Sequence, residues 1–569
     1  MADFFDSHAH QKNQPRVKLN LQNGSYTTLD LSQKASAWFW ASEMEMTNMF
    51  DDDASSLARL CDTGLSLDSQ RVALIQGERS MTYAELEQRI NRVANGLISL
   101  GVERFERVLV IFENDIRFPE VLLGIVRAGA VAVPVNFKFQ PAQHIELARD
   151  CGSRIVFGSA GKAESVLACL ADGVAEVGIV VDADRGPLRS YEDWLASSSP
   201  ERCDHGSAGS DVCIQAYTSG STGRPKGVLL AHRGLLRNVQ LQVESNRIDE
   251  NSRVLLSTPL FHMNATASGL LPCLSQGGSV VILKEFDAER VIDAIETLGC
   301  TYTTGVPATY KLILAAARQR THVDASSLEF IAVGSAPMTR ALLDELVLTL
   351  PGVDVIEGYG LTECGPIITL NPRGRNKLGT IGPALPGFEC KVIDSDGNIL
   401  PQGEAGELVV RSECNALGYY NRPDAQAERF RDGWVHTGDM VSCDPDGWFT
   451  FRGRVDDQMN VGGENVFPAE VENILATHPE VRDVCVVPVP HEVKGQVPVA
   501  FVVRNVESNL GEKELIDYYL TRGPAYSHPR RIYFIDEMPL LATGKTDLQA
   551  LARQAREPGP GTGPSSLAR

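Results

Sequence analysis

The sequence predicts an α/β protein with a large domain of parallel-rich sheets layered with helices and a small β-rich subdomain. Two patterns predict this fold. Apolar runs of strand length alternate with amphipathic helical segments from residue 81 onward, and short strands separated by Gly and Asp-Gly turns dominate residues 382–448. The length of 569 residues also implies several folding units rather than one core.

The first helix shows the pattern clearly. Thr82 stands where an N-cap is expected and Glu85 follows three residues later, as in a capping box. The apolar face then carries Leu86, Ile90, Val93, Ala94 and Leu97. Further strands are expected at 108–112, 130–134, 211–216, 228–230, 254–258, 278–283, 330–333 and 353–356, and helices at 119–128, 287–298 and 338–350. Repeated strand–helix units imply parallel sheets with ligands beyond the carboxyl ends of the strands.

The order of these segments predicts an N-terminal extension (1–60), an α/β region from residue 61 that becomes β-rich from about 382, and a tail (556–569). The tail is rich in Pro and Gly, which predicts disorder.

Composition excludes some classes of partner. With 53 basic and 73 acidic residues the net charge is −20, which argues against a nucleic-acid partner. The most apolar stretch, 121–135, is interrupted by Arg127 and is too short to span a bilayer. The N-terminus has no signal-peptide pattern, and the twelve cysteines show no disulfide or zinc spacing, so we expect a cytoplasmic protein with reduced thiols. The sequence does not indicate the oligomeric state.

The stretch 217–227 reads Y-T-S-G-S-T-G-R-P-K-G and lies between two apolar strand runs. Glycines let the backbone approach a ligand, while hydroxyls, backbone N–H groups and Lys226 can surround phosphate oxygens. A flexible Ser/Gly linker is the alternative, but linkers seldom lie between two buried strands. The Walker loop is excluded because Lys226 is followed by Gly227 rather than Ser or Thr.

This stretch resembles the signature loop of the adenylate-forming superfamily, which includes acyl-CoA synthetases, carrier-protein-loading adenylation domains and luciferases. The resemblance implies ATP phosphate binding, with Lys226 also catalytic and Thr222 near the metal. The implied loop contacts are Thr218, Ser219, Gly220, Ser221, Thr222, Gly223 and Lys226.

Two turns after predicted strands extend the resemblance. Tyr359 offers a flat face for adenine, and Thr362 and Glu363 offer hard oxygens for Mg²⁺. The family match implies adenine stacking by Tyr359, and metal contact and a catalytic role for Glu363. The remaining members of these nucleotide turns are Gly334, Ser335, Ala336, Pro337, Glu357, Gly358 and Gly360.

The C-terminal third carries the other family motifs. Thr437-Gly-Asp439 resembles the ribose motif, in which Asp439 accepts both ribose hydroxyls and Arg454 reaches the same sugar or phosphate. Asp456 matches the family's hinge. The resemblance therefore implies a large N-terminal domain (61–455) and a small mobile α+β C-terminal domain (456–555). The loop at Gly462 and Gly463 matches the segment that forms the tunnel for the pantetheine thiol.

Near the C-terminus, Lys545 matches the catalytic lysine that contacts the carboxylate and the α-phosphate during adenylation. The chain departs from the family around this lysine, reading Thr546-Asp-Leu548 after it. Other departures are Tyr526-Ser-His528-Pro in place of Tyr-Lys-x-Pro, and Lys494 where many CoA ligases carry Trp.

The expected substrate is a carboxylic acid without an α-amino group. The segment 259–265, P-L-F-H-M-N-A, has no carboxylate where amino-acid-activating domains place Asp, so fatty, aryl or polycyclic acids are favoured. The expected pocket residues are His262 (also catalytic), Met263, Val306, Gly334, Gly360 and Ile367.

The predicted function is ATP-dependent formation of an acyl-AMP followed by transfer to coenzyme A, with ATP, Mg²⁺ and coenzyme A as cofactors. Two alternatives stay open because of the C-terminal departures. One is transfer to a carrier protein, and the other is an enzyme that retains only thioesterification of a supplied acyl-adenylate. A luciferase-like oxygenase is a third, without specific support in the sequence.

Overall fold

A computed structural model describes the backbone at 17–20 and 26–29 and the chain at 56–183, 186–203, 205, 207–218, 225–336, 338–505, 508–540 and 546–556. Seven predicted site residues lie outside these ranges, as do tail residues 557–569. The seven are Ser219, Gly220, Ser221, Thr222, Gly223, Pro337 and Lys545. The chain divides into two compact units, 1–51 and 52–569. In the first, β1 (Val17–Asn20) pairs antiparallel with β2 (Tyr26–Leu29).

The first sheet of the second unit has eight strands in the order β21-β11-β10-β6-β5-β7-β8-β9. Its interior pairs are parallel, and β10–β11 and β11–β21 are antiparallel. The strands are β5 (Arg107–Ile111), β6 (Val131–Pro134), β7 (Ile155–Gly158), β8 (Val177–Val180), β9 (Arg189–Ser190), β10 (Val212–Thr218), β11 (Lys226–Ala231) and β21 (Gly418–Tyr419). The helices of this region are α2 (Tyr83–Ser99), α3 (Phe118–Arg127), α4 (Pro141–Cys151), α5 (Ala163–Asp172) and α6 (Tyr191–Ala196).

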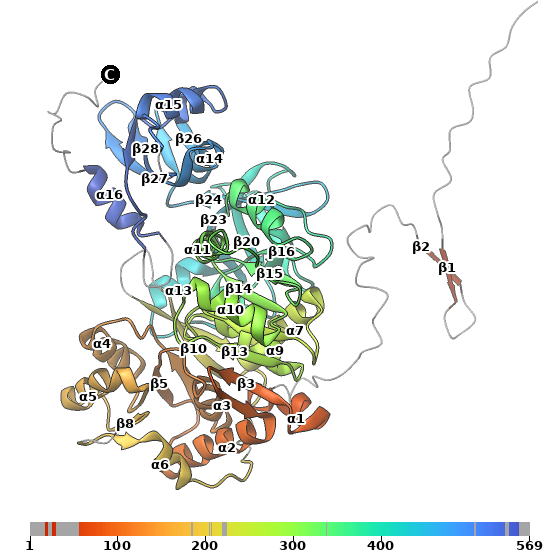
Figure 1. The fold of residues 1–569 in the computed structure, drawn as a ribbon, viewed down its shortest axis with the longest axis vertical. Helices are drawn as coiled ribbons and strands as arrows, with labels where there is room; N and C mark the ends of the chain where they lie inside the picture. Colours follow the sequence, from red (N-terminus) through yellow and green to blue (C-terminus); the bar gives the residue numbers. More distant parts are fainter. Residues whose placement is uncertain are drawn as a thin grey trace, which may run out of the picture. The chain divides into compact units, whose positions relative to one another are not determined.

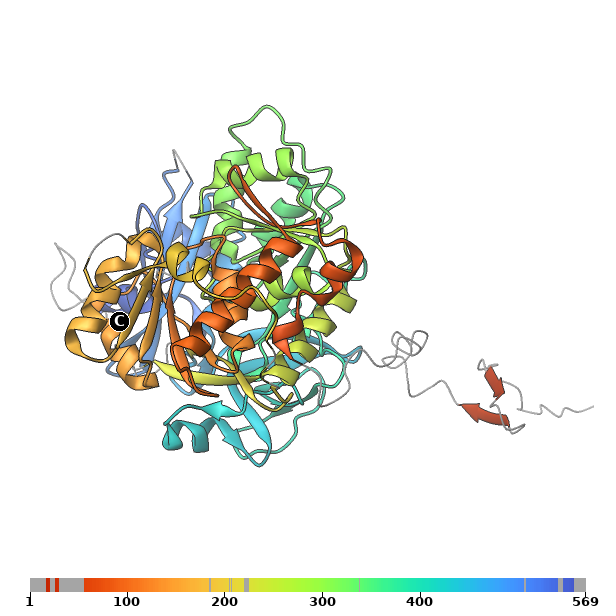
Figure 2. The ribbon, with the colours of Figure 1, turned by 90° about the horizontal axis from the view of Figure 1, so that it is seen from below.

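The second sheet also has eight strands, in the order β17-β16-β15-β14-β12-β13-β3-β4. They are β3 (Val72–Gln76), β4 (Arg79–Thr82), β12 (Arg253–Leu256), β13 (Ser279–Ile282), β14 (Tyr302–Gly305), β15 (Phe330–Val333), β16 (Asp354–Tyr359) and β17 (Thr369–Leu370). The helices of this region are α1 (Asp62–Asp68), α7 (His232–Asn246), α8 (Met263–Ala265), α9 (Leu271–Ser275), α10 (Ala288–Leu298), α11 (Pro307–Ala317) and α12 (Arg340–Thr349). The strands of both sheets are flanked by helices in the two views (Figure 1 and Figure 2).

Two smaller sheets follow. The first contains β18 (Gly382–Pro383), β19 (Glu389–Ile393), β20 (Ala405–Arg411), β22 (Phe430–Arg431), β23 (Trp434–Cys443) and β24 (Trp448–Arg454), with helix α13 (Pro423–Arg429). The second contains β25 (Met459–Val461), β26 (Glu464–Val466), β27 (Val481–His491), β28 (Gly495–Arg504) and β29 (Arg531–Phe534), with α14 (Pro468–Leu475), α15 (Glu512–Leu520) and α16 (Leu548–Arg556). This second sheet has its own hydrophobic core, which is consistent with a separate C-terminal domain.

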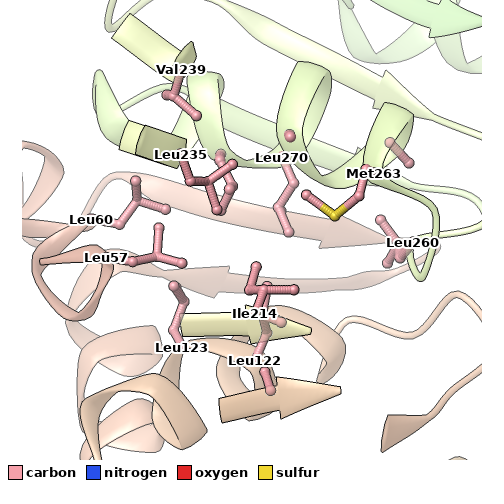
Figure 3. Packing of buried hydrophobic residues seen from close by; sticks show 14 of the residues in the cluster. Leu57, Leu60, Leu122, Leu123, Ile214, Leu235, Val239, Leu260, Met263 and Leu270 are labelled. Atoms are coloured by element: carbon pink, nitrogen blue, oxygen red, sulfur yellow. The ribbon is translucent and has the colours of Figure 1, made fainter. Parts of the chain in front are cut away.

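The hydrophobic core explains why the helices form where the sequence predicts them. Thr82 and Glu85 form the reciprocal capping box at the start of α2. The five apolar residues predicted for the inner face of α2 are completely buried. Figure 3 shows side chains of α3, β10 and α7, among them Leu122, Ile214 and Leu235, meeting in one cluster. The predicted α/β fold class is confirmed, and no helix of the described ranges is long and apolar enough to cross a membrane.

One strand is longer than predicted. The sequence pattern ends it at Ile356, whereas β16 continues through Gly358 and Tyr359. Gly358 pairs with Leu370 of β17, and a Cβ at Gly358 would lie 2.8 Å from a Leu370 methyl carbon. Glycine therefore lets the strand continue where an added Cβ would force the Leu370 side chain to shift.

Candidate active site

The ends of the signature loop are fixed by an antiparallel pair of strands. Thr218 is the last residue of β10 and lies opposite Lys226, the first residue of β11. Gly227 follows, and a Cβ there would lie 2.6 Å from Nε2 of Gln215. The strand pair therefore holds one hydroxyl and one ammonium together at the base of the loop, where phosphate oxygens are expected.

The carboxylate of Asp150 joins this strand pair to the segment after β21. The Tyr217 hydroxyl donates a hydrogen bond of 2.6 Å to Oδ2 of Asp150, which lies on α4. Arg422, which follows β21, forms an ion pair with the same carboxylate. Asp150 thus links the start of the loop to a segment more than 200 residues further along the chain.

The predicted adenine and ribose residues contact one another directly. The Tyr359 hydroxyl at the end of β16 donates to Oδ2 of Asp439 at 2.7 Å, and both residues are buried. Asp439 lies on β23, and Nε of Arg454 on the adjacent β24 is 3.5 Å from its Oδ1. The Asp439 N–H donates to the buried Thr437 hydroxyl at 3.1 Å, which fixes the backbone of the Thr-Gly-Asp turn.

Glu363 lies on a short 3-10 helix, Thr362–Cys364, after β16. Its carboxylate is almost completely buried and accepts a 2.6 Å hydrogen bond from the Tyr419 hydroxyl. The pKa of the Tyr419 phenol lies well above its ordinary value, mainly because the group is buried and also because Glu363 is negatively charged. The hydroxyl therefore keeps its proton and remains a donor. Nζ of Lys226 lies 5.5 Å from the centroid of the Tyr419 ring. Tyr419 therefore connects the predicted metal ligand to the base of the signature loop.

The turn after β15 joins the nucleotide residues to a small cavity. Ser335 has a φ of +65°, a strained conformation for a residue with a side chain, and its hydroxyl accepts from Nδ2 of Asn264 at 3.3 Å. A Cβ at Gly334 would lie 3.2 Å from the carbonyl oxygen of Gly358, so this turn packs against β16. Ala336 is the third member of the turn and is half-buried.

The cavity is bounded by apolar and neutral polar side chains. Among the residues that the structure describes, no carboxylate lines it. The lining residues are Thr258, Pro259, Phe261, His262, Asn264, Val306 and Ser335. Of the predicted pocket residues, His262 and Val306 therefore lie on the cavity.

The other predicted pocket residues lie elsewhere. Met263 is buried in the hydrophobic core beside Leu260 and Leu270 (Figure 3). Gly360 packs so tightly that a Cβ would lie 1.8 Å from the carbonyl oxygen of Pro366. The Asn238 side chain donates from Nδ2 to the Ile367 carbonyl and accepts at Oδ1 from the Ile367 N–H. None of these three residues lines the cavity.

The Glu357 side chain contacts the loop at Gly379. Its carboxyl accepts a 3.2 Å hydrogen bond from the Gly379 N–H, and burial raises its pKa to about 7. The unfolded chain releases this proton near pH 4.5 whereas the folded chain keeps it until about pH 7, so ionisation favours unfolding as pH rises across this window.

We therefore predict that Glu357→Gln stabilises the protein above pH 7. The amide retains an acceptor for the Gly379 N–H but carries no buried charge. The expected gain is about 3 kcal/mol at pH 8, disappearing near pH 4.5. Denaturant unfolding of both proteins from pH 4.5 to 8 measures it. Glu285→Gln, at an exposed carboxyl, is the control, and equal stability of wild type and Glu357→Gln at pH 8 would contradict the prediction.

The C-terminal candidates lie on turns. Asp456 is exposed between β24 and β25. Gly462 and Gly463 form the β25–β26 turn with φ values of +65° and +98°, a conformation that favours glycine, and the Gly462 N–H donates to the Lys494 carbonyl at 2.9 Å. Lys311 of α11 forms a 2.5 Å ion pair with Asp483 of β27. Lys545 lies outside the described residues.

The sequence patterns missed several residues of this site. Asp150, Tyr419 and Arg422 lie outside the sequence motifs, and Asn264 lies within the 259–265 segment but was not predicted as a site residue. Gly418-Tyr-Tyr-Asn-Arg stands out in the sequence as a polar and aromatic stretch. Asn264 is hydrogen-bonded to Thr304 as well as to Ser335, the Thr304 hydroxyl donating to its Oδ1 at 2.7 Å. Each of these residues acts through a partner distant in sequence.

The cavity adjoins the residues predicted to bind the nucleotide. Ser335 lines the cavity while the neighbouring Gly334 packs against the strand that carries Tyr359. The fold and the site thus define an adenylate-forming enzyme.

Comparison with known proteins agrees with this class. The AMP-binding enzyme family matches residues 66–420, and the AMP-binding enzyme C-terminal domain matches residues 470–545. The chain belongs to the AMP-binding enzyme family, in the acyl-CoA ligase branch of the adenylate-forming superfamily. It is an AMP-forming acid–thiol ligase, which activates a carboxylic acid with ATP and transfers the acyl group to a thiol to form a thioester.

Three relatives illustrate the similarity. A feruloyl-CoA synthase of Amycolatopsis sp is 36% identical, covering 83% of this chain and 94% of the relative. A 4-coumarate–CoA ligase of Solanum tuberosum is 32% identical, covering 85% and 91%. The crystal structure of an anthranilate CoA ligase in complex with anthranoyl-AMP superposes with a TM-score of 0.83 at 29% identity, covering 88% of this chain and 98% of that one.

Proposed function

We propose that this ligase activates an aryl carboxylic acid of one ring, with or without a propenoic side arm, and transfers the acyl group to coenzyme A. The observation that carries the proposal is the cavity beside the nucleotide residues. Its described lining combines apolar side chains with hydroxyl, amide and imidazole groups and contains no carboxylate. The similar proteins are named for the aryl acids ferulate, 4-coumarate and anthranilate, which supports an aryl acid as the substrate of this enzyme as well.

The cavity can recognise such an acid by shape and by neutral polar groups. Phe261 and Val306 supply apolar surface for a ring, and Phe137 packs edge-on against Phe261 with centroids 5.8 Å apart. Nδ1 of His262 accepts from the Asn264 N–H at 3.2 Å, so a neutral ring carries its proton on Nε2. We assign that proton to a hydrogen bond with the acid's carboxylate.

In the first step a carboxylate oxygen of the acid attacks the α-phosphorus of ATP. The bond from that phosphorus to the bridging oxygen of the β-phosphate breaks, which gives acyl-AMP and pyrophosphate. Asp439 holds the ribose and Tyr359 the adenine, while Thr218 and Lys226 hold the phosphates. The residues position two anions and neutralise developing charge, which is the main contribution a protein makes to such a transfer.

The Mg²⁺ expected with ATP fits the donors present. Glu363 offers carboxylate oxygens, which are hard ligands of the kind Mg²⁺ prefers, and one of its two oxygens is already fixed by Tyr419. Thr222 is the second proposed ligand. When bound, the metal neutralises charge on the triphosphate oxygens.

In the second step the thiol of coenzyme A attacks the acyl carbon. The carbon–oxygen bond to AMP breaks, AMP leaves, and the thiol proton is lost to solvent. We assign Gly462 and Gly463 to the thiol tunnel, Asp456 to the hinge between domains 61–455 and 456–555, and Lys545 to the first step only. We place the enzyme in the cytoplasm, which supplies ATP and coenzyme A; its twelve cysteines form no disulfide in the described structure.

The test is a panel of acids scored separately for pyrophosphate exchange and for thioester formation. Ferulate, 4-coumarate, benzoate and anthranilate represent aryl acids; octanoate and palmitate represent fatty acids; phenylalanine represents amino acids. We expect exchange and coenzyme A thioester with at least one aryl acid, with kcat/KM about 100-fold above the fatty acids. A rigid ring packs against Phe261 and Val306 with little loss of conformational entropy, whereas a flexible chain must be ordered on binding.

Three outcomes would contradict the proposal. Exclusive use of fatty acids would overturn the substrate class. Exchange with transfer only to a phosphopantetheinylated carrier protein would select the carrier alternative. Thioester formation from a supplied acyl-adenylate without pyrophosphate exchange would select an enzyme restricted to the second step.

A further inference from the structure

We infer that Tyr419 is a positioning residue that holds Glu363 in the orientation required to bind Mg²⁺ with ATP. The inference rests on the proposed function, because that proposal assigns Glu363 to the metal. Tyr419 lies outside the sequence motifs described above. It would act on the metal only through Glu363.

The position of Tyr419 depends on the strand that completes the first sheet. Tyr419 is the last residue of β21 and pairs with Val228 of β11, two residues after Lys226. The backbone of Ala416, just before β21, also donates to the Glu363 carbonyl at 2.9 Å. The segment at 416–419 therefore joins the signature loop's exit strand to the 3-10 helix of Glu363 by backbone and side-chain bonds together.

The hydrogen bond to Glu363 has the features of a strong, orienting contact. The two oxygens are 2.6 Å apart, which is within the range of charge-assisted O–H···O⁻ bonds. Glu363 and Tyr419 are each only 7% exposed to solvent. A carboxylate has two oxygens, and fixing Oε1 stops rotation of the group. The other oxygen is then directed without the entropy loss that ordering a free carboxylate on metal binding requires.

The ring and the hydroxyl of Tyr419 have separable roles. The ring packs edge-on against Phe430, with centroids 5.6 Å apart, and lies near the Lys226 ammonium. Phenylalanine preserves both ring contacts and removes the hydroxyl, which bonds Glu363 and also interacts with the Arg429 side chain. The Glu363→Gln background described below separates these two contacts. Tyr419→Phe consequently tests the orientation of Glu363 without opening a cavity in the packing.

The experiment measures ATP binding by calorimetry as a function of Mg²⁺, and Mn²⁺ binding to the ATP complex by electron paramagnetic resonance. We expect Tyr419→Phe to raise the Mg²⁺ concentration for half-maximal ATP binding about tenfold. Binding of AMP without metal should stay unchanged, since AMP depends on Asp439 and Tyr359. In a Glu363→Gln background, adding Tyr419→Phe should cause no further loss of metal-dependent binding.

Tyr420→Phe is the matched control, since the Tyr420 hydroxyl makes no hydrogen bond in the part of the chain the structure describes. Thermal unfolding checks the folding of each variant. If Tyr419→Phe does not fold, Glu363→Gln tests the same metal contact while an amide acceptor remains for the Tyr419 hydroxyl.

An unchanged Mg²⁺ requirement, or an equal loss of metal-free AMP affinity, would overturn the inference. So would a normal Mg²⁺ requirement in Glu363→Gln. Because the readout is binding, it is independent of turnover: a wild type that binds Mg·ATP but activates no acid contradicts the proposed function and leaves the binding comparison valid.

Discussion

Lys545→Ala is expected to reduce acid-dependent pyrophosphate exchange by about 10²–10³-fold, the loss typical of removing one group that stabilises transition-state charge. The family resemblance assigns its ammonium to the carboxylate and the α-phosphate during adenylation. Thioester formation from a supplied acyl-adenylate should change by less than about threefold, because that step no longer involves the α-phosphate transfer. Both rates are measured on the same preparation, with coenzyme A present only in the second assay.

The control for this prediction is Lys391→Ala, since the Lys391 ammonium lies 4.2 Å from the ring centroid of Trp434 in the β-rich sheet. Lys545→Arg adds a further comparison, because it keeps the charge but not the shape of the ammonium. Equal losses in both half-reactions would show that Lys545 supports folding or both steps, and would contradict its assignment to adenylation.

Asp439→Asn is expected to weaken the binding of both ATP and AMP by about 10- to 100-fold. The carboxylate is buried between the Tyr359 hydroxyl and the Arg454 guanidinium, and an amide offers one acceptor where the ribose hydroxyls need two. The Tyr359 hydroxyl can still donate to the amide oxygen, so the fold should survive. Calorimetry with each nucleotide measures the loss, and AMP binding isolates the ribose contact from the metal.

Asp444→Asn supplies the matched control for Asp439. It lies just after the same strand, β23, and pairs with Lys377 away from the proposed ribose site. Near-normal nucleotide affinity in Asp439→Asn would exclude the ribose role. A loss confined to ATP, with AMP binding intact, would instead place Asp439 with the phosphates.

The outline of the fold could be predicted because periodicity is a local property. The capping box at Thr82 and the buried face of α2 follow directly from residue spacing, and so do the strands on either side of the signature loop. The end of β16 was predicted too early, because glycine is read locally as a turn. Only the pairing of Gly358 with Leu370 shows that the strand continues.

The candidate site divides in the same way. Motif spacing pointed to Tyr359 and Asp439, which the structure brings within 2.7 Å although they are 80 residues apart. It also pointed to Met263 as a pocket residue, whereas the helical turn after His262 directs Met263 into the core and its neighbour Asn264 to the cavity. One residue along a helix is a rotation of about 100°, which a motif match does not resolve.

By itself the sequence determined the α/β class, the signature loop and the chemical types gathered around a nucleotide, because these depend on residue types at short spacing. Only the tertiary structure decided which distant side chains hold them in place. Asp150 and Arg422 meet across 272 residues, and Tyr419 reaches Glu363 across 56. Such contacts are set by the order of strands in the first sheet and by burial that requires each polar group to find a partner, and neither is encoded in local spacing.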